Sequence, residues 1–578
     1  MKTIEKKRLF NHSKTGRFAM IDQLLMDDIH YMFGNPGTVE QGFLDGLSDY
    51  PDFKYILTLQ ETVAVAIADG YARALQKPAV VQLHSGVGLG NGIGMMYQAK
   101  RGHSPLVIIN GEAGIRYDAM DAQMAADLVA MAEPVTKWAT RVMDPSSVLR
   151  VLRRAIKMAV TPPMGPVFVC LPMDILDAPN EEAVVPSTLL VTQVAPELDQ
   201  IAQAATLLAA AQKPMIIIGD GVAASAAQAE VTQVAELAGA EVWGANSSEV
   251  NMSSKHPLFR GQLGHMFGEQ SQPITSQADV VLICGTYVFP EVFPALSGVF
   301  APGAKVMHID LDAYEVAKNF PVDLGMISDP KTTLARLAEA LKTMMTADQK
   351  TAASARVASN TAAKEREEIA WREADKLKRE VVPLFPSRFM EELANQLPPD
   401  AILFDEALTT TPDLLHYLPP TTPGHYFQTR GGSLGVGIPG AIGLKLAYPD
   451  KTVIGLSGDG ASMYTIQALW TAAHYKIGAK FIVCNNHSYE LLKLNLQQYW
   501  RERQLPEHQF PDLFDILVPD IQFAALAQAM GVPGVRVERP EQIAPAIHQA
   551  LDNDGPFLID LVITSEVPGH LVHVPCGQ

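Results

Sequence analysis

The stretch KTVIGLSGDGASMYTIQALWTAAHYKIGAKFIVCNN, residues 451–486, decides the fold. An aliphatic run leads into Gly458-Asp459-Gly460, an amphipathic segment follows over 464–475, and a second aliphatic run ends at Asn485-Asn486. This pattern predicts a strand, a crossover helix and a second, parallel strand. Both polar motifs then lie at the carboxyl ends of neighbouring strands, where open α/β sheets bind their ligands.

The same alternation of short aliphatic runs and longer amphipathic segments extends over the whole chain. Strands that are buried on both faces of a parallel sheet are continuous apolar runs of this kind. The sequence contains KPAVVQLHS, SPLVIING and GPVFVCLP in its first third, PMIIIGDG, ADVVLICG and KVMHIDLD in its second, and AILFDEA and GPFLIDLV in its last. We therefore predict an α/β fold with three doubly wound parallel-sheet domains.

Two changes of composition separate these domains. Residues 179–197 carry three prolines and no clear periodicity, and residues 345–386 form a charged, alanine-rich stretch that ends at prolines. Both features are typical of connections between domains. We predict domains over residues 1–185, 195–345 and 386–578, with a helical linker over 346–385.

Charge and composition exclude several classes of function. Lys and Arg number 45 against 63 Asp and Glu, and nucleic-acid phosphates or an anionic membrane surface would repel the resulting net charge of −18. The aliphatic runs are much shorter than the roughly 20 residues that a bilayer-spanning helix needs. The four cysteines lack the spacing of a disulfide framework or a zinc site. We expect a cytoplasmic protein with a small-molecule partner, no nucleic acid and no membrane.

Asp459 and Asn486 have the chemistry of a cation site. One carboxylate and one amide oxygen can converge there on a hard cation, and Mg²⁺ commonly completes its oxygen ligands from a bound phosphate group. The flanking glycines allow backbone to approach such a phosphate, and the N-terminus of the following helix favours an anion. A lone GDG motif is usually a tight turn. Together with both strands and the paired asparagines, it predicts a site for Mg²⁺ and a diphosphate.

The GDG and NN motifs at this separation resemble the signature of the thiamine diphosphate-dependent enzyme superfamily. The resemblance is to its benzoylformate decarboxylase branch, which is related to acetolactate synthase and pyruvate decarboxylase, and it extends over nearly the whole chain. It rests also on FGNPGT (33–38), LQETVAVAIADGYA (59–72), LHSGVGLGNGIG (83–94), HPLFRG (256–261), FDEALTTT (404–411) and GGSLGVGIPGAIG (431–443). It implies a pyrimidine-binding domain, a central Rossmann-like domain and a diphosphate-binding domain, in that order.

The resemblance implies thiamine diphosphate and Mg²⁺ as cofactors. Asp459 and Asn486 would ligate the metal through their side chains, and Ser488 through its backbone carbonyl oxygen. Leu434 would separate the two rings of the cofactor and hold it bent. Further cofactor contacts are implied for Thr409, Gly432, Gly458, Gly460, Ala461, Ser462 and Tyr489.

The resemblance also implies three catalytic side chains. Glu61 would hydrogen-bond the N1′ atom of the cofactor's pyrimidine, which promotes removal of the thiazolium C2 proton. His84, at the end of a predicted strand, is the candidate proton relay, because histidine titrates near neutrality. Thr38 supplies a hydroxyl where the branch has serine, whereas Val292 stands where the branch has a second histidine. The exchange at Val292 argues against benzoylformate itself as the substrate.

The implied activity is non-oxidative decarboxylation, or lyase cleavage, of 2-oxo acids through a C2 carbanion or enamine, which an aldehyde acceptor could capture in carboligation. Two alternatives from the same superfamily stay open: an acetolactate synthase-like acyl transferase, and a flavin-containing oxidase with FAD, the less favoured cofactor, in its central domain. A third interpretation is a non-catalytic protein that binds the cofactor, against which Glu61 argues. The resemblance implies a homodimer as the minimum and a homotetramer as the expected assembly.

Overall fold

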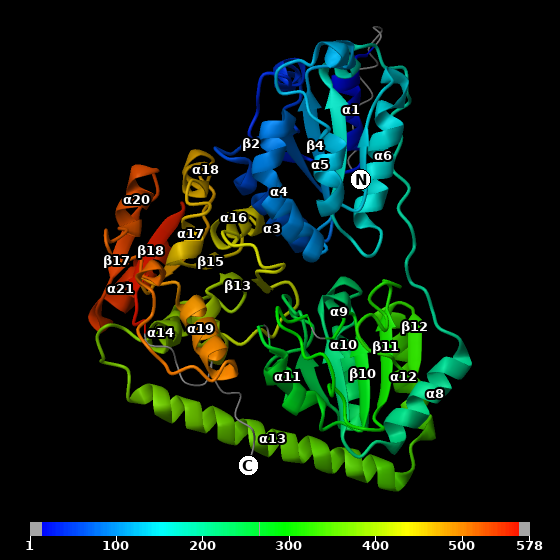
Figure 1. Cartoon of the computed structure of the whole chain (residues 1–578), viewed down its shortest axis with the longest axis vertical. Coiled ribbons are helices and arrows are strands. Elements are labelled where there is room, and N and C mark those ends of the chain that lie inside the picture. The colour runs from blue at the N-terminus through cyan, green and yellow to red at the C-terminus, as the bar shows by residue number, and fades with distance from the viewer. Residues whose placement is uncertain (1–13, 265, 289, 566–578) are drawn as a thin grey trace. The chain divides into compact units, whose positions relative to one another are not determined.

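The computed structural model describes residues 14–264, 266–288 and 290–565 of the chain. It contains three six-stranded sheets in which the strands pair in parallel (Figure 1), so the predicted α/β fold with three parallel sheets is confirmed. The chain divides into two compact units. The first comprises the described residues up to Val191 with Arg430–Pro449 and Thr465–Ile477. The second comprises Thr192–Thr429, Asp450–Tyr464 and the described residues from Gly478 onward.

The first sheet lies in the first unit and has the strand order β2-β1-β3-β4-β6-β5. Its strands are β1 (Tyr31–Gly34), β2 (Lys54–Leu57), β3 (Ala79–His84), β4 (Leu106–Glu112), β5 (Ala139–Arg141) and β6 (Val167–Pro172). Its helices are α1 (Gly16–Met26), α2 (Gln41–Gly46), α3 (Glu61–Leu75), α4 (Ser85–Arg101), α5 (Leu128–Ala132), α6 (Val148–Val160) and α7 (Met173–Asp177), with short 3-10 turns η1 (Leu47–Asp49), η2 (Ile115–Met120), η3 (Glu133–Val135) and η4 (Pro145–Ser147). The central strands β4 and β6 are buried along their whole length, as their continuous apolar sequence predicts.

Helix α3 packs closely against α16 (Gly437–Ala447), which belongs to the same unit. A Cβ at Gly70 would lie 2.4 Å from the carbonyl oxygen of Gly440, and one at Gly443 would lie 2.1 Å from that of Ile67. Only glycine permits such close approach of two helix backbones. This contact fixes α3, whose first residue is Glu61, relative to the loop that precedes α16.

The second sheet has the order β12-β11-β10-β7-β8-β9 and lies in the second unit. Its strands are β7 (Pro214–Ile218), β8 (Glu241–Gly244), β9 (Phe259–Gln262), β10 (Val280–Cys284), β11 (Lys305–Asp310) and β12 (Leu324–Ile327). Its helices are α8 (Leu198–Ala210), α9 (Asp220–Ala224), α10 (Gln228–Ala238), α11 (Gly268–Thr275) and α12 (Pro330–Met344). One buried cluster, centred on β7, β10 and the inner faces of α10 and α12, forms the core on one side of this sheet.

Helix α13 (Ala347–Lys376) follows in sequence and is the longest helix in Figure 1. It begins with a capping box, in which Thr346 and Gln349 each hydrogen-bond the other's backbone N–H. Of its 30 residues only Ala353 is fully buried. The charged sequence of this segment therefore forms a largely solvated helix, as its composition indicates.

The third sheet has the order β14-β13-β15-β16-β18-β17. Its strands are β13 (Ile402–Glu406), β14 (Tyr426–Gln428), β15 (Val453–Gly458), β16 (Lys480–Asn485), β17 (Gly534–Val537) and β18 (Phe557–Val562). The remaining helices are α14 (Pro386–Gln396), α15 (Thr411–Tyr417), α17 (Asp459–Ser462), α18 (Ala468–His474), α19 (Glu490–Glu502), α20 (Phe523–Ala529) and α21 (Pro540–Asp552), with 3-10 turns η5 (Leu408–Thr410) and η6 (Asp512–Phe514). Gly458 pairs with Cys484 in the ladder of β15 and β16. The two polar motifs therefore follow neighbouring strand ends, as predicted.

The crossover between these strands differs in detail from the sequence prediction. A continuous helix was expected over 464–475, whereas α18 begins only at Ala468 and α17 is a separate single turn. Thr465 explains the late start, because its hydroxyl donates to the carbonyl oxygen of Gly435 at 2.7 Å and holds the chain in a turn. None of the helices in the described part of the chain combines the length and apolar character needed to cross a membrane.

Candidate active site

The GDG turn places Asp459 in a buried position, where β15 ends and α17 begins. The backbone N–H of Gly460 donates to Asp459 Oδ1 at 2.7 Å, whereas Oδ2 has no hydrogen-bond donor among the residues that the structure describes. Burial raises the pKa of Asp459 to about 6, although nearby backbone N–H groups at residues 486–488 lower it. A buried carboxylate with an unpartnered oxygen is unfavourable, and a cation beside it would remove that cost.

The paired asparagines at the end of β16 have different partners. Asn485 Nδ2 donates to Asp560 Oδ1 at 3.0 Å, and Arg536 Nη1 lies 3.2 Å from the other oxygen of that aspartate. Asn486 Oδ1 accepts the backbone N–H of Ser488 at 3.0 Å. Asn485 is thus engaged within the third sheet, and only Asn486 belongs to the loop beside Asp459.

Ser488 and Tyr489 are held by the segment that follows α19. The Ser488 hydroxyl and the Tyr489 backbone N–H both donate to the carbonyl oxygen of Phe514, at 3.1 and 2.8 Å. A Cβ at Gly460 would lie 2.4 Å from the Tyr489 ring, so glycine is required at this position of the GDG turn. The segment after α19 therefore supports the loop that carries the predicted metal ligands.

The other residues of the turn leave open space on one side. A Cβ at Gly458 would meet no heavy atom within 4 Å. Ala461 and Ser462 are buried, and the Ser462 hydroxyl donates to the Gly458 carbonyl oxygen at 2.8 Å. The predicted diphosphate contact from the Ser462 hydroxyl competes with this bond, whereas the space beside Gly458 suits the close approach of a phosphate.

Thr409, another predicted diphosphate contact, lies half-buried in the turn η5 at the end of β13. Leu408 before it has a φ of 48°, a left-handed conformation that is rare for an aliphatic side chain. The buried Asp405 supports this turn, because its carboxylate accepts the backbone N–H of Ala407 and the hydroxyl of Tyr426, both at 2.8 Å. Such over-determined strained turns are typical of functional sites.

Gly432 and Leu434 lie in the loop before α16, in the first unit. Gly432 has a φ of 81°, and a Cβ there would meet no heavy atom within 4 Å. Gln98 Oε1 accepts the backbone N–H of Ser433 at 3.2 Å and fixes the loop on α4. Leu434 is half-buried, so part of its side chain is available for contact with another group.

Glu61 begins α3 and is 6% exposed. Its two carboxylate oxygens accept the side-chain amides of Asn35 at 3.2 Å and Asn91 at 3.0 Å. Both asparagines lie within the motifs that carry the resemblance, but the sequence gives no sign that they converge on Glu61. The two amide donors fix both oxygens of the carboxylate and leave each oxygen a further lone pair.

His84 is paired with a second acid that the sequence analysis missed. Its Nδ1 lies 3.0 Å from Oε2 of Glu40, which also accepts the backbone N–H of Gly37 at 3.0 Å. Burial raises the pKa of Glu40, and His84 lowers it by a smaller effect. A Cβ at Gly37 would lie 2.2 Å from the imidazole ring, so glycine is required for His84 to reach Glu40.

Glu61 and His84 face the same point of the first unit. A Cβ at Gly88, on α4, would lie 3.2 Å from Glu61 Oε1 and 3.3 Å from His84 Cβ. Thr38 is exposed in the turn that follows β1, between Asn35 and Glu40 in sequence. Val292 lies in the second unit and is 56% exposed.

The carboxyl end of the second sheet, where a nucleotide would bind, is closed by its own backbone. Gly221 N–H donates to the carbonyl oxygen of Gly285 at 2.9 Å, across the ends of β7 and β10. Asp220 accepts the backbone N–H groups of Ser248 at 2.9 Å and Glu249 at 3.1 Å. These donors are therefore already used within the protein.

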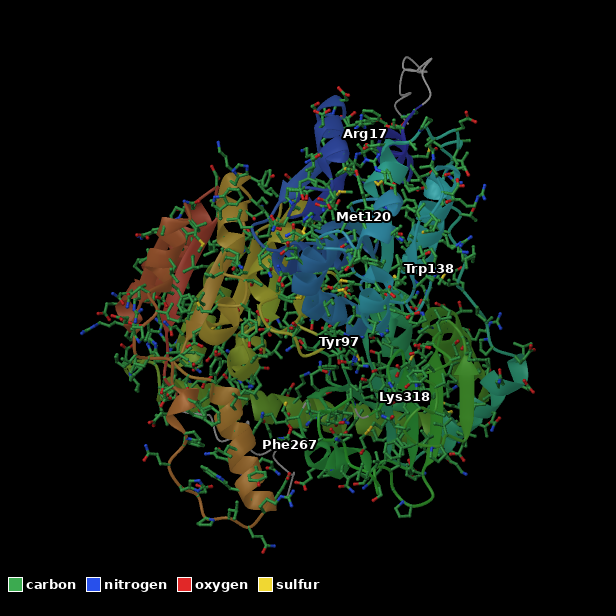
Figure 2. The ribbon with its side chains drawn as sticks, turned by 45° about the horizontal axis from the view of Figure 1, so that its top comes forward. Arg17, Tyr97, Met120, Trp138, Phe267 and Lys318 are labelled. Atoms are coloured by element: carbon green, nitrogen blue, oxygen red, sulfur yellow. The ribbon has the colours of Figure 1, made fainter. Side chains whose placement is uncertain are left out.

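Lys318, labelled in Figure 2, closes the neighbouring part of this sheet end. Its ammonium lies 3.9 Å from the centre of the Tyr287 ring and 3.1 Å from the carboxylate of Glu315. Both contacts satisfy the cation within the domain. This geometry gives no support to an adenine nucleotide in the central domain.

Comparison with known protein families identifies the class of protein. Three thiamine pyrophosphate enzyme models match: the N-terminal TPP-binding domain over residues 14–131, the central domain over 201–337 and the C-terminal TPP-binding domain over 409–561. A curated relative, benzoylformate decarboxylase of Pseudomonas aeruginosa, is 31% identical over 555 residues, which are 95% of this chain and 98% of the relative. The chain belongs to the thiamine pyrophosphate enzyme family.

Individual relatives carry two kinds of name. A probable acetolactate synthase large subunit of Methanococcus aeolicus is 29% identical, with coverage of 95% of this chain and 92% of that protein. The solved structure of a thiamine diphosphate-dependent 4-hydroxybenzoylformate decarboxylase from Rhodococcus jostii superimposes with a TM-score of 0.83 at 27% identity, covering 96% of this chain and all of that one. Benzoylformate decarboxylase from Polynucleobacter necessarius also gives a TM-score of 0.83, at 26% identity and 96% coverage of this chain.

The residues at the GDG turn fit Mg²⁺ and a diphosphate. Within the described chain, Oδ2 of the buried Asp459 has no hydrogen-bond partner, and the amide oxygen of Asn486 and the Ser488 carbonyl belong to the adjoining loop. These are oxygen ligands, which Mg²⁺ prefers. The open space beside Gly458 would admit a group that approaches the backbone closely.

Proposed function

We propose that this enzyme is a thiamine diphosphate- and Mg²⁺-dependent non-oxidative decarboxylase or lyase of 2-oxo acids, with aldehyde ligation as a second outcome. We further propose that it acts in the cytoplasm as a homotetramer, with a homodimer as the smallest active unit. The observation that carries the activity is the pair of specialised carboxylates. Glu61 is held by two neutral amides, and Asp459 has an oxygen left without a partner.

Asp459, Asn486 and Ser488 would hold Mg²⁺ and, through it, the diphosphate. Gly458, Gly460, Ala461, Ser462, Thr409 and Tyr489 would surround the diphosphate end, and Gly432 and Leu434 the ring end. The Ser488 carbonyl is held in place through its own loop, because Asn486 Oδ1 accepts the Ser488 N–H. The chemistry that bound thiamine diphosphate supplies is an electron sink, which takes up the electron pair left when CO₂ departs from a 2-oxo acid.

Glu61 would bind the pyrimidine ring by a charge-assisted hydrogen bond. Asn35 and Asn91 each donate to one oxygen of the carboxylate and so fix its direction. A hydrogen bond to such a charged group is worth roughly 1.5–3 kcal/mol. Glu61 would thereby hold a proton at a ring nitrogen, while the apolar residues around α3 exclude water.

His84 would transfer protons at the substrate. With Nδ1–H donating to Glu40, the neutral ring would carry its lone pair on Nε2, which can accept a proton and later return it. Glu40 would hold the imidazole in this tautomer. Thr38 would supply a hydroxyl to the substrate carboxylate from the exposed turn nearby.

Val292 supports a substrate other than benzoylformate. Where the branch has a second imidazole, this chain has an aliphatic side chain that cannot move a proton. Of the two positions at which the branch has histidines, only His84 is a histidine in this chain. We expect a 2-oxo acid whose product needs a single proton donor.

The decisive experiment follows CO₂ and product with a panel of 2-oxo acids, with and without acceptor aldehydes. The protein is reconstituted with thiamine diphosphate and Mg²⁺. We expect CO₂ release that requires both cofactors. If no 2-oxo acid is decarboxylated but an acyloin or an acyl-CoA is cleaved, the lyase proposal stands and the decarboxylase proposal is wrong.

The second candidate is an acetolactate synthase-like acyl transfer, which the name of the Methanococcus relative supports. It differs in the acceptor, a second 2-oxo acid in place of a proton or an aldehyde. Formation of a 2-hydroxy-2-alkyl-3-oxo acid from pyruvate would favour it. A flavin absorption band in the purified protein would favour the oxidase, against which the closed end of the second sheet argues.

A further inference from the structure

Three side chains that could bind a metal lie close together at the end of α13 and on α15. None of them belongs to the GDG turn. Asp375 lies in the last turn of α13, and Asp413 and His416 lie one helical turn apart on α15. One carboxylate oxygen of each aspartate and one ring nitrogen of His416 all lie within 4.8 Å of one another. Both helices belong to the second unit.

Asp413 is the buried acid of this cluster. It is 7% exposed, and no hydrogen-bond donor contacts its carboxylate among the residues that the structure describes. Burial, and then the neighbouring Asp375, raise the pKa of Asp413 to about 7, while Lys378 lowers it. The Lys378 ammonium lies 5.0 Å from the centre of the Phe385 ring.

The other two side chains are fixed in direction by their neighbours. The His416 ring stacks on Trp371 of α13, with centroids 4.4 Å apart and planes 8° from parallel. The Tyr417 hydroxyl donates to Asp375 Oδ2 at 3.1 Å, which orients that carboxylate. Arg372 pairs with Glu368 at 2.8 Å, and its guanidinium carbon lies 4.7 Å from the centre of the Trp371 ring. The cluster therefore brings together two acids and an oriented imidazole.

We propose that Asp375, Asp413 and His416 bind a divalent transition-metal ion, with Zn²⁺ as the ion of best fit. Two carboxylate oxygens and one imidazole nitrogen are a ligand set that Zn²⁺ accepts, with water in the remaining position, at roughly 2.0–2.2 Å from each ligand. Ligand atoms that already lie within 4.8 Å need about an ångström of side-chain movement to reach that geometry. The mixed nitrogen and oxygen set distinguishes this site from the all-oxygen Mg²⁺ site at Asp459.

The ion would fasten the end of the linker helix to the cofactor-binding domain. Helix α15 begins directly after η5, the turn that carries Thr409. Few buried contacts hold α13, in which only Ala353 is fully buried. A metal bond at its last turn would therefore stabilise the junction between the linker and the turn beside the proposed diphosphate site.

The test is a zinc titration of the holoenzyme. Saturating thiamine diphosphate and millimolar Mg²⁺ first fill the Asp459 site, and calorimetry then measures Zn²⁺ binding. We expect one Zn²⁺ per chain in the wild type, with a dissociation constant raised at least about tenfold in Asp413→Asn and in His416→Gln. Co²⁺ as a second probe should quench the Trp371 fluorescence, and Trp371→Phe should remove that part of the quenching.

His474→Gln is the matched control. His474 stacks on Trp470 as His416 does on Trp371, with centroids 4.7 Å apart and planes at 13°, but it is not part of a cluster of metal-ligating groups in the described chain. It should bind Zn²⁺ as the wild type does. Absence of zinc binding in the wild type would overturn the proposal, and so would unchanged binding in His416→Gln. If Asp413→Asn does not fold, zinc binding by His416→Gln, a change at a half-buried residue, tests the proposal alone.

Discussion

Two buried carboxylates of similar exposure, Glu61 in the first unit and Asp459 in the second, are held in opposite ways. Both oxygens of Glu61 accept side-chain amides, from Asn35 and Asn91. Asp459 has one oxygen without a donor and a pKa that burial raises to about 6. The first arrangement stabilises a charge before any ligand arrives. The second leaves the charge to be compensated by a ligand, which is what a cation site requires.

The asparagines near the two carboxylates extend this contrast. Asn35 and Asn91 donate to Glu61, whereas the amide oxygen of Asn486 accepts the backbone N–H of Ser488. A donor beside Asp459 would fill the position that a metal ion needs. Side-chain amides thus donate to both oxygens of Glu61, whereas Asp459 receives no such donor at Oδ2 in the described chain.

The largest effect is expected for Glu61→Gln, which removes the charge but keeps the shape. Turnover should fall by about 10²–10⁴-fold, the usual contribution of positioned acid–base catalysis. Mg²⁺ binding, measured by quenching of protein fluorescence, should remain close to that of the wild type, and thiamine diphosphate should still bind, with an affinity lower by at most roughly 10- to 150-fold. Near-full activity in this variant would remove Glu61 from the mechanism.

Asp459→Asn should weaken Mg²⁺ binding but stabilise the apo-protein. Apparent Mg²⁺ affinity should fall by about 100-fold or more, because an amide replaces a charged ligand. The apo-protein should become more stable at pH 8, since the wild-type carboxylate is ionised there against its raised pKa. A shift from the usual carboxyl pKa to about 6 corresponds to about 3 kcal/mol in unfolding free energy.

The pH dependence gives the sign of this stability effect. The folded apo-protein binds a proton at Asp459 more tightly than the unfolded chain, so its stability falls as the pH rises from about 4 to 6. The difference between wild type and Asp459→Asn should therefore vanish below pH 4. Thermal unfolding with and without Mg²⁺ and thiamine diphosphate measures both effects. A variant less stable than wild type at pH 8 without ligands would contradict the argument.

Asp459, Asn486 and Glu61 could be located from the sequence because each follows directly from a strand end or helix start. The aliphatic runs determine those ends, and the order of the strands brings Asp459 and Asn486 together. The partners of these residues could not be found in this way. Glu40 meets His84 only because β1 and β3 are neighbours in the sheet, and a pairing shifted by two residues would separate them.

The same limit applies to helix ends and to contacts between distant segments. The helix over 464–475 was wrong at its start, because the competing bond from Thr465 to Gly435 is tertiary. The cluster of Asp375, Asp413 and His416 joins a linker helix to a helix from another part of the chain. Its sequence has neither the spacing nor the cysteines of a usual zinc motif.

Glu40→Gln should lower kcat/KM roughly 10- to 100-fold, less than the loss of Glu61, because His84 keeps its ring and loses only its oriented acceptor. Burial raises the pKa of Glu40, so in the wild type its carboxylate is lost at a higher pH than an exposed glutamate. The acid limb of the pH profile should reflect this ionisation and should be absent or displaced in the variant. An unchanged acid limb would show that Glu40 does not control His84. Stopped assays between pH 4 and 8 would measure it.

Glu490→Gln should have the smallest effect, and it tests whether the open carboxylate at Asp459 acts alone. Glu490 is 6% exposed, and its Oε2 has no hydrogen-bond donor in the described chain, although the Lys493 ammonium lies 3.9 Å away. Burial raises the pKa of Glu490, Lys493 lowers it, and Asp459 adds a smaller effect that raises it. A second carboxylate near Asp459 would strengthen cation binding, so the variant should weaken Mg²⁺ binding by roughly three- to tenfold. Glu502→Gln, at the exposed far end of the same helix α19, is the matched control and should leave Mg²⁺ affinity unchanged. If Glu490→Gln also leaves it unchanged, the single unpartnered oxygen of Asp459 accounts for the electrostatics of the site. Asp459 then differs from Glu61 only in the hydrogen-bond donor that its Oδ2 lacks in the described chain.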